Sequence, residues 1–228
     1  MNDSSTVTNY QIYLVNQGTT AKTFWCFLEQ PEGIQSPEVF ANSSAALSVT
    51  PNYGGTNSFT IPLQYQIGAG ACNQAVGLDV KVITNIAQDT ALQSVWNAEY
   101  ATVPPNQGPQ LSRVQAQQSP ADTIRVLSNT FDRRKNENNQ WYSNMTFGIL
   151  SSNGFMGVTW SPSPNETSTI TPKFGFYIST GSYRSENLAD IASISRDAVK
   201  VELNDFSQLE ATVTLTSTGE LIVTPGKP

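Results

Sequence analysis

Apolar and polar side chains alternate along almost the whole chain, and this two-residue period restricts the possible folds more than any other feature. Successive side chains of a β-strand point to opposite faces of the sheet, so the period predicts strands with one buried face. The alternation is clearest from Phe59 to Ile67, where Pro62 predicts an edge or bulged strand. The segment Phe24–Leu28 is apolar on both faces, which predicts a central or covered strand.

Short segments of this kind recur between turn signals, and the chain is expected to form roughly ten strands. They cover residues 10–14, 23–28, 59–67, 76–82, 124–126, 141–150, 155–160, 169–179, 199–203, 213–215 and 221–223. The turn sequences Ser151–Gly154 and Ser217–Gly219 predict two hairpins. Many short strands with frequent turns are typical of an all-β fold, and we expect a jelly-roll-like antiparallel β-sandwich.

A few segments interrupt the alternation. Leu92, Val95 and Trp96 have helical spacing, which predicts a short helix within residues 89–99, and residues 188–194 favour a helical turn. The run Gly68–Ala71 is expected to form a tight loop between strands, and the polar run Asp132–Asn139 a solvated loop.

The chain length favours one folding unit. Its 228 residues lie within the range of a single all-β domain, so residues 1–228 are expected to form one sandwich. Residues 103–121 are rich in Pro, Gln, Gly and Ser and are expected to form a long polar loop near the middle of it.

Charged residues are scarce, at 13 % of the chain against about 25 % in an average protein. The formal net charge is −6 and the isoelectric point about 4.6, which argues against nucleic acid and anionic membranes as partners. Asn, Gln, Ser and Thr take the place of charged residues. A surface of such groups repels copies of itself weakly, and its repulsion falls further as carboxylates protonate near pH 4–5.

The chain has no histidine, which excludes Ser–His and Cys–His nucleophile pairs and His-ligated metals. No phosphate-binding loop or nucleophile elbow is present. Paired carboxylates of the glycosidase type stay open in principle, because there are 18 acidic residues, but no pair stands out. We therefore expect a protein that is not an enzyme, with no catalytic residues, no metal and no cofactor.

The two cysteines, Cys26 and Cys72, are too few for a disulfide framework or a metal set. Cys26 lies in an aromatic strand and is expected to be buried, whereas Cys72 follows the Gly68–Ala71 run and is expected in a loop. Three states stay open: free thiols, a disulfide within the chain, and a disulfide between two chains.

Four tryptophans offer aromatic surface for contacts. Trp25 and Trp160 are expected in the core. Trp141 adjoins the polar run Asp132–Asn139, which makes it the residue to consider for an exposed aromatic contact.

Two pairs of segments carry a resemblance to known proteins. They are Asn9–Asn16 with Thr23–Leu28, and Met145–Ile149 with Gly157–Pro162. They resemble a group of crystal-forming all-β proteins shared by bacteria and zygomycete fungi, the OCTIN-like proteins. The resemblance extends over most of the chain but transfers no functional residue. It implies a protein that accumulates and packs into ordered assemblies, with a part for the cysteines, and a place in a vacuole or inclusion.

The first expectation for function is therefore a structural protein whose partner is itself, in a homo-oligomer or lattice favoured in acid. The alternatives are a β-rich toxin or membrane-binding module, for which residues 57–67 and 165–179 offer the membrane strands, and a lectin-like domain that binds glycans. The start of the chain, Met1–Thr8, shows no signal peptide. An intracellular place or non-classical secretion is expected on that ground.

Overall fold

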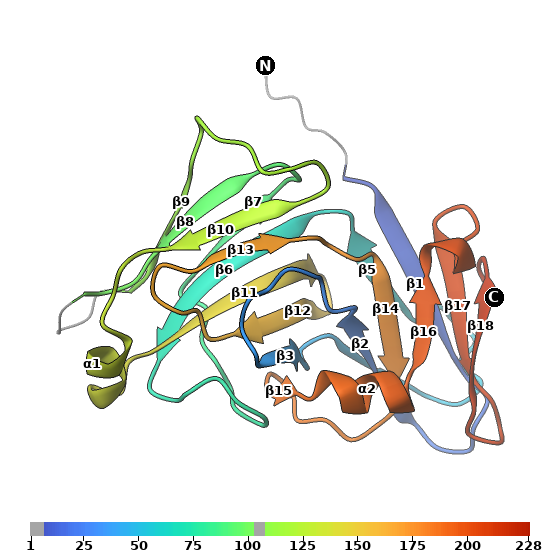
Figure 1. Ribbon diagram of the computed structural model, residues 1–228. Coiled ribbons are helices and arrows are strands. Elements are labelled where there is room, and N and C mark those ends of the chain that lie inside the picture. Colours follow the sequence, from blue (N-terminus) through green and yellow to red (C-terminus); the bar gives the residue numbers. More distant parts are fainter. Residues whose placement is uncertain (1–6, 103–107) are drawn as a thin grey trace.

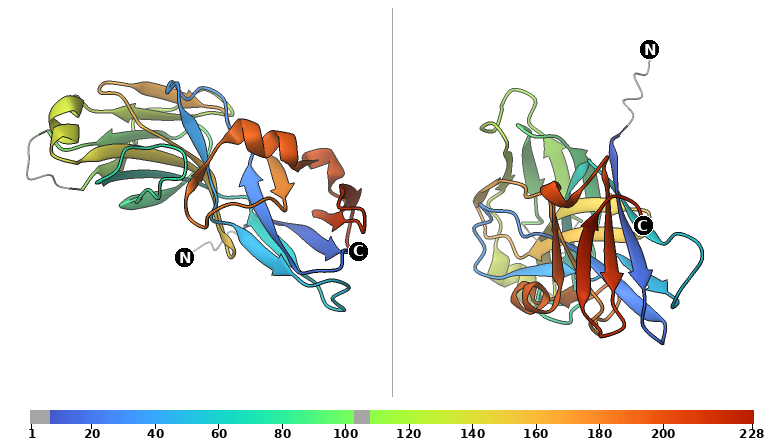
Figure 2. Two further views of the ribbon diagram at one scale, coloured as in Figure 1. Left: turned by 90° about the horizontal axis from the view of Figure 1, so that it is seen from below. Right: turned by 90° about the vertical axis from the view of Figure 1, so that its right-hand side faces the viewer.

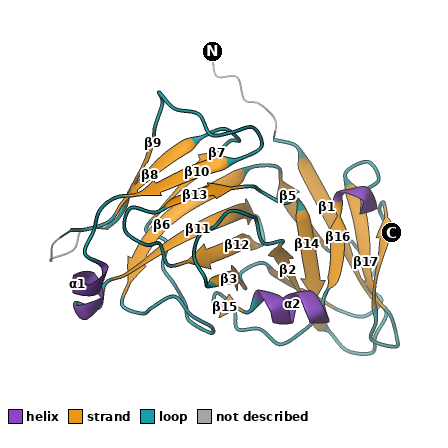
Figure 3. Cartoon of the chain, in the orientation of Figure 1, coloured by secondary structure: helices purple, strands orange, loops and turns teal. Residues whose placement is uncertain are grey.

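A computed structural model describes residues 7–102 and 108–228 (Figure 1). The described residues form 18 strands, two short α-helices and one 3₁₀ turn, and Figure 3 distinguishes the strands in orange from the helices in purple. In chain order the elements are β1 (Asn9–Asn16), β2 (Lys22–Leu28), β3 (Val39–Asn42), β4 (Ala46–Val49), β5 (Ser58–Pro62), β6 (Tyr65–Cys72), β7 (Ile86–Thr90), β8 (Val95–Glu99), β9 (Gln110–Arg113), β10 (Ile124–Ser128), α1 (Arg133–Asn138), β11 (Tyr142–Ser151), β12 (Gly154–Trp160), β13 (Thr167–Ile170), β14 (Gly175–Ser179), β15 (Leu188–Ala189), α2 (Ile191–Asp197), β16 (Val199–Glu202), η1 (Leu203–Asp205), β17 (Glu210–Leu215) and β18 (Leu221–Pro225).

The strands form four sheets, which pack in two pairs. The sheet β18-β17-β1-β5 packs against β16-β14-β2-β4, and we call this pair the first sandwich. The six-stranded sheet β15-β3-β12-β11-β6-β7 packs against β13-β10-β8-β9, which makes the second sandwich. Figure 1 shows the first sandwich on the right and the second on the left. The predicted all-β sandwich class is confirmed, with more strands than the roughly ten expected.

The hairpin β11–β12 contributes side chains to the cores of both sandwiches. Ile149 and Met156 lie in the core of the first sandwich, whereas Met145, Phe147 and Val158, on the same two strands, lie in the core of the second. The chain also passes between them six times, at β2–β3, β3–β4, β5–β6, β13–β14, β14–β15 and β15–β16. The molecule is accordingly elongated, as the left view of Figure 2 shows.

Two strand pairs are parallel, which departs from a purely antiparallel sandwich. They are β1 with β17 and β8 with β10. Parallel neighbours require a long connection. Between β1 and β17 lies most of the chain, so the first and last parts of the protein meet in one sheet, and the Tyr13 hydroxyl donates to Glu210 at 2.8 Å.

Both long strands expected from the alternation are divided at the border between the sandwiches. The segment 59–67 breaks at Leu63, after Pro62, so that β5 is an edge strand of one sheet and β6 belongs to another. The segment 169–179 breaks in the same way between β13 and β14. Alternation continues through both breaks because each half buries its own face, so the sequence period does not show the change of sheet.

Two expected elements are wrong. Residues 89–99 form the end of β7, a turn and β8 instead of a helix. The apparent helical spacing arises because Val95 and Trp96, which follow the turn, are both buried. The Trp96 indole N–H donates to the Thr90 hydroxyl at 2.8 Å. Residues 76–82 form no strand in the structure but an extended loop, in which Leu78 is 56 % exposed.

Two runs expected as loops are regular structure. Gly68–Ala71 lies inside β6, because another part of the chain crosses its outer face and requires small residues there. Arg133–Asn138 forms α1, whose N-cap Asp132 accepts from the backbone N–H of Lys135 at 3.0 Å. The Asn136 side chain is buried and donates to the carbonyl of Ala101 at 2.7 Å, which fixes the helix to the second sandwich.

The predicted hairpins and the helical turn near residues 188–194 correspond to elements of the structure. The hairpins β11–β12 and β17–β18 form around the predicted turns. The helical turn near residues 188–194 corresponds to α2, which begins at Ile191 and covers the outer face of β2. The long loop 103–121 contains β9, while its residues 103–107 lie outside the described residues.

Candidate functional site

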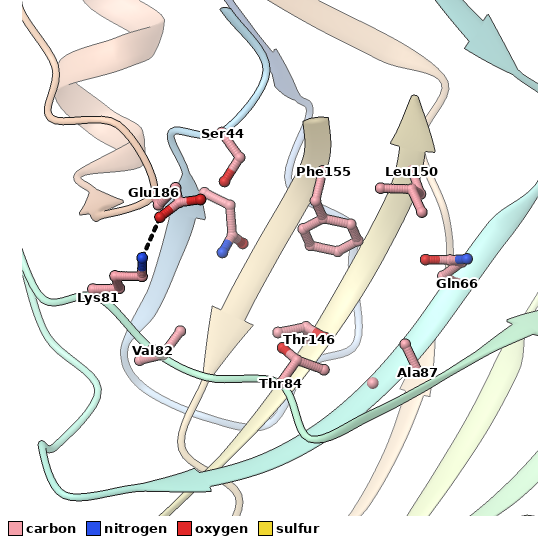
Figure 4. A pocket seen from close by; sticks show the side chains of 12 residues that line it. Ser44, Gln66, Lys81, Val82, Thr84, Ala87, Thr146, Leu150, Phe155 and Glu186 are labelled. Atoms are coloured by element: carbon pink, nitrogen blue, oxygen red, sulfur yellow. Dashed lines mark hydrogen bonds and ion pairs between the residues drawn. The ribbon is translucent and has the colours of Figure 1, made fainter. Parts of the chain in front are cut away.

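A groove of about 340 Å³ opens on the outer face of the six-stranded sheet (Figure 4). Its floor is formed by β3, β6, β11 and β12, and one wall by residues 77–85, which we call the strap. The lining residues are Asn42, Ser44, Gln66, Gly68, Lys81, Val82, Thr84, Ala87, Thr146, Leu150, Phe155 and Glu186. None of them was predicted as a site residue from the sequence, and Gly68 was expected in a tight loop.

The apolar part of the groove is built on a pair of glycines. Gly148 and Gly157 are direct neighbours on β11 and β12. A Cβ at either position would come within 2.8 Å of the Phe155 ring, so the ring lies against this bare stretch of backbone. Its cross-strand partner Leu150 is 50 % exposed, and Figure 4 shows the two side chains side by side in the groove.

The polar part of the groove is a row across the sheet. Thr159 lies opposite Thr146, which in turn lies opposite Gly68. The Thr159 hydroxyl is buried and donates to Oδ1 of Asn42 at 3.0 Å. Thr146 and Asn42 are 4 % and 8 % exposed, and within the described residues neither the Thr146 hydroxyl nor Nδ2 of Asn42 has a hydrogen-bond partner. Both groups border the groove.

The strap is held by backbone hydrogen bonds at one end. The N–H of Asp79 donates to the carbonyl of Leu188 at 2.8 Å, and the N–H of Leu188 donates to the carbonyl of Val80 at 2.9 Å. Further along, Nδ2 of Asn144 donates to the carbonyl of Ile83 at 3.1 Å.

Glycines in β6 let the strap lie close to the sheet. A Cβ at Gly70 would lie 2.0 Å from the carbonyl oxygen of Ile83, and one at Gly68 would lie 2.7 Å from the Thr84 methyl. Real Cβ atoms do not approach other atoms so closely, so the crossing strap requires glycine at positions 68 and 70. The alanines of the run Gly68–Ala71 face the opposite way; Ala69 is part of the second core.

Charges at the groove are compensated. Lys81 and Glu186 form an ion pair at the rim, drawn as a dashed line in Figure 4. Both side chains are about 60 % exposed, so the pair adds little stability. Gln66 donates to Asp89 at 2.8 Å at the far side. Amides, hydroxyls, one aromatic ring and a neutral ion pair make an arrangement for binding an uncharged polar molecule.

Acidic residues gather at a second place, beside β2 and β14. Glu29 lies within 3.2 Å of Lys200, and Lys173 lies 2.8 Å from Glu32. Lys173 holds the pKa of Glu32 below its usual range, and the carboxylates of Glu202 and Glu29 raise the pKa of Lys200. Every carboxylate here has a lysine partner, so the cluster is an ion network at the surface of the first sandwich.

Both cysteines are free and buried. Cys26 is fully buried in the core of the first sandwich, and burial raises the pKa of its thiol. Cys72 is the last residue of β6, not a loop residue, and its thiol donates to the carbonyl of Gln74 at 3.2 Å. The structure contains no disulfide between them, and neither thiol is at the surface.

Trp141 lies between α1 and β11 and is half-buried. Its backbone N–H donates to the carbonyl of Asn136 at 2.9 Å. Its indole Nε1 is buried and has no hydrogen-bond partner in the described part of the chain. Trp141 is not among the residues of the groove.

The described residues contain no group of three or more His, Cys, Asp or Glu side chains that would hold a metal ion. A helix of the length and apolar character needed to cross a bilayer is also not found in residues 7–102 and 108–228.

A trace of the groove is present in the sequence. Alternate glycines at positions 68 and 70, and a glycine pair at 148 and 157, mark strand faces on which something lies closely. What lies there depends on strand pairing, which the alternation does not specify. Comparison with known proteins gave no match to a family model, to a curated sequence or to a solved structure.

Proposed function

We propose that this chain is a non-enzymatic structural protein that associates with copies of itself through the edge strand β18. The observation that carries the proposal is the open side of this strand. β18 ends its sheet, and its only strand partner among the described residues is β17 (Figure 1). An open edge presents unpaired N–H and C=O groups that pair with another strand.

The register identifies the free groups. Thr216 donates to the carbonyl of Glu220, and Gly226 donates to the carbonyl of Glu210, at 2.8 and 2.9 Å. Hydrogen-bonded pairs alternate in an antiparallel ladder, so Leu221, Val223 and Pro225 direct their backbone groups to the free side. Two β18 strands that meet antiparallel at Val223 form four backbone hydrogen bonds, because the carbonyl of Pro225 accepts from Leu221 of the other copy.

Surface charge supports the same proposal. Only 13 % of the residues are charged, and the net charge is −6. Protonation of carboxylates below about pH 5 removes most of this repulsion, so association increases in acid. Because both cysteines are buried, the contacts are non-covalent. The resemblance to crystal-forming all-β proteins implies the same behaviour, and an acidic protein of this kind has no electrostatic attraction to nucleic acid.

The membrane alternative has weaker support. Each of its two expected membrane strands is divided between the two sandwiches, at Leu63 and between β13 and β14. A membrane strand requires about ten continuous residues. Liposome leakage is the corresponding test, and we expect no release of dye.

Edge variants test the proposal by light scattering and negative-stain imaging between pH 4.5 and 8. Ile222 and Thr224 are exposed on β18, and lysines there oppose edge pairing. We expect the Ile222→Lys, Thr224→Lys double variant to lower association at least tenfold, and reductant to have no effect.

The matched control is Leu92→Lys, a lysine at a 43 % exposed position of the second sandwich. It should associate like the parent chain. A parent chain that stays monomeric throughout the pH range, or an edge variant that associates as well as the control, contradicts the proposal.

A further inference from the structure

We propose that the groove on the outer face of the six-stranded sheet binds a neutral carbohydrate, with Phe155 as the stacking surface and Thr146 and Asn42 as hydrogen-bonding groups. The site is separate from β18 and does not depend on assembly. Its ligand class follows from the shape, the polar groups and the charge of the groove.

Polar atoms that face the groove are the first indication. Thr146 and Asn42 are more than nine-tenths buried as residues and border the groove. The Thr146 hydroxyl and Nδ2 of Asn42 have no hydrogen-bond partner within the described residues, and neither is a fully buried atom, so both are open to the groove. A ligand that supplies a hydroxyl to each atom can form a hydrogen bond with both.

The aromatic ring is the second indication. One face of Phe155 covers the glycine pair Gly148 and Gly157, and the ring is half-buried, so its other side is open to the groove. A pyranose ring has an apolar C–H face with hydroxyls around its edge. Such a ring lies on Phe155 while its hydroxyls reach Thr146, Ser44 and Gln66, the groups placed around Phe155 in Figure 4.

Charge selects a neutral ligand. Lys81, the one cationic side chain among the described lining residues, is paired with Glu186 at the rim, so its charge does not favour a phosphate or carboxylate. An acyl chain fits poorly, because it would leave Thr146 and Asn42 without partners. The volume of about 340 Å³ lies near the lower end of the range for small-molecule pockets, about 300–1,000 Å³, which suits one or two sugar rings.

The test uses the full chain as a monomer near pH 7.5, with labelled methyl groups observed by NMR. Glucose, mannose, galactose and N-acetylglucosamine are titrated separately to millimolar concentrations. We expect at least one sugar to give saturable shifts in the methyl groups of Val82, Thr84, Thr146 and Leu150. Absence of saturable shifts with all four sugars overturns the proposal.

Two variants test the roles of the residues. Thr146→Val keeps the shape and removes the hydroxyl, and we expect about a tenfold weaker affinity. Phe155→Leu keeps an apolar cover over the glycines but removes the flat ring, and we expect binding to be lost. An unchanged melting temperature of each variant separates loss of binding from loss of folding.

The matched control is Thr214→Val, the same substitution at a half-buried position of β17, outside the groove. Its affinity should equal that of the parent chain. Equal affinities for Thr146→Val and Thr214→Val, or saturable shifts only outside the groove, contradict the proposal. Self-association is measured separately, so failure of one proposal leaves the other standing.

Discussion

Two buried side chains and one partly buried tyrosine make the protein sensitive to alkaline pH. Burial raises the pKa of Tyr65 to about 12 and raises the pKa of the Cys26 thiol and of the Tyr100 hydroxyl, which donates to the carbonyl of Asn144 at 2.7 Å. In the unfolded chain these groups ionise near their ordinary values, 9.0 for the thiol and 10.0 for the phenols. Above those values the unfolded state binds fewer protons than the folded state.

As far as these three groups decide it, the free energy of unfolding should therefore be constant between about pH 7 and 8 and fall as pH rises further. Tyr65 alone accounts for at most about 2–3 kcal/mol between pH 10 and 12. Urea unfolding at fixed pH values from 7 to 11 measures the effect. Cys26→Ala should lower stability at pH 7 but flatten the decline between pH 9 and 10. An equal decline in Cys26→Ala and the parent chain would argue against a role for the thiol.

At the scale of elements, the strap depends on the absence of a side chain beneath it. Gly70→Ala places a methyl group on the carbonyl of Ile83, so the strap must lift from β6. We expect a loss of about 1–3 kcal/mol in the free energy of unfolding and faster hydrogen exchange at the amides of Asp79 and Leu188.

Gly54→Ala is the matched control, because a Cβ at Gly54 meets no atom within 4 Å. It should leave both the unfolding midpoint and the exchange rates unchanged. Equal stability of Gly70→Ala and Gly54→Ala would show that the strap does not rest on the sheet as described.

Elements fixed by local chemistry were predictable, and those fixed by distant partners were not. The hairpin β11–β12 follows from its turn and from alternation on both sides, all within adjacent residues. The division of residues 59–67 follows from two different sheets, of which only Pro62 gives a local sign. Residues 76–82 alternate like a strand, yet only Asp79 and Val80 bond to a strand, at Leu188 on the edge strand β15, and the rest of the segment crosses a sheet face.

For the candidate site the limit is similar. Alternate glycines in β6 indicate a close approach, but Phe155, Thr146 and Asn42 come together only through the pairing of three strands. For Cys72 the glycine-rich run before it gave a wrong prediction, namely a loop. The run lies in β6 instead, and its glycines accommodate the strap that covers this strand.

At the scale of the whole molecule, the shared hairpin β11–β12 should make the two sandwiches unfold together. Phe147 is fully buried in the second core, and Ile149, two residues further along β11, lies in the first. We expect Phe147→Ala to lower the stability of both sandwiches in one transition, by about 3–5 kcal/mol.

Calorimetry, with circular dichroism and tryptophan fluorescence in urea, measures this cooperativity. Leu92→Ala, at an exposed position, should leave the transition in place. Two separate transitions in Phe147→Ala, with one at the midpoint of the parent chain, would mean that the sandwiches are independent domains.

The parallel pairing of β1 with β17 has a consequence for biosynthesis. The second core is made from residues between Ile67 and Ile170, all of which have left the ribosome well before the chain is finished. β1 is synthesised first, but its neighbour β17 is among the last segments to appear. The nascent chain therefore carries β1 paired on one side with β5 and open on the other until translation ends, and a chain truncated before Glu210 keeps that open edge exposed to chaperones and proteases.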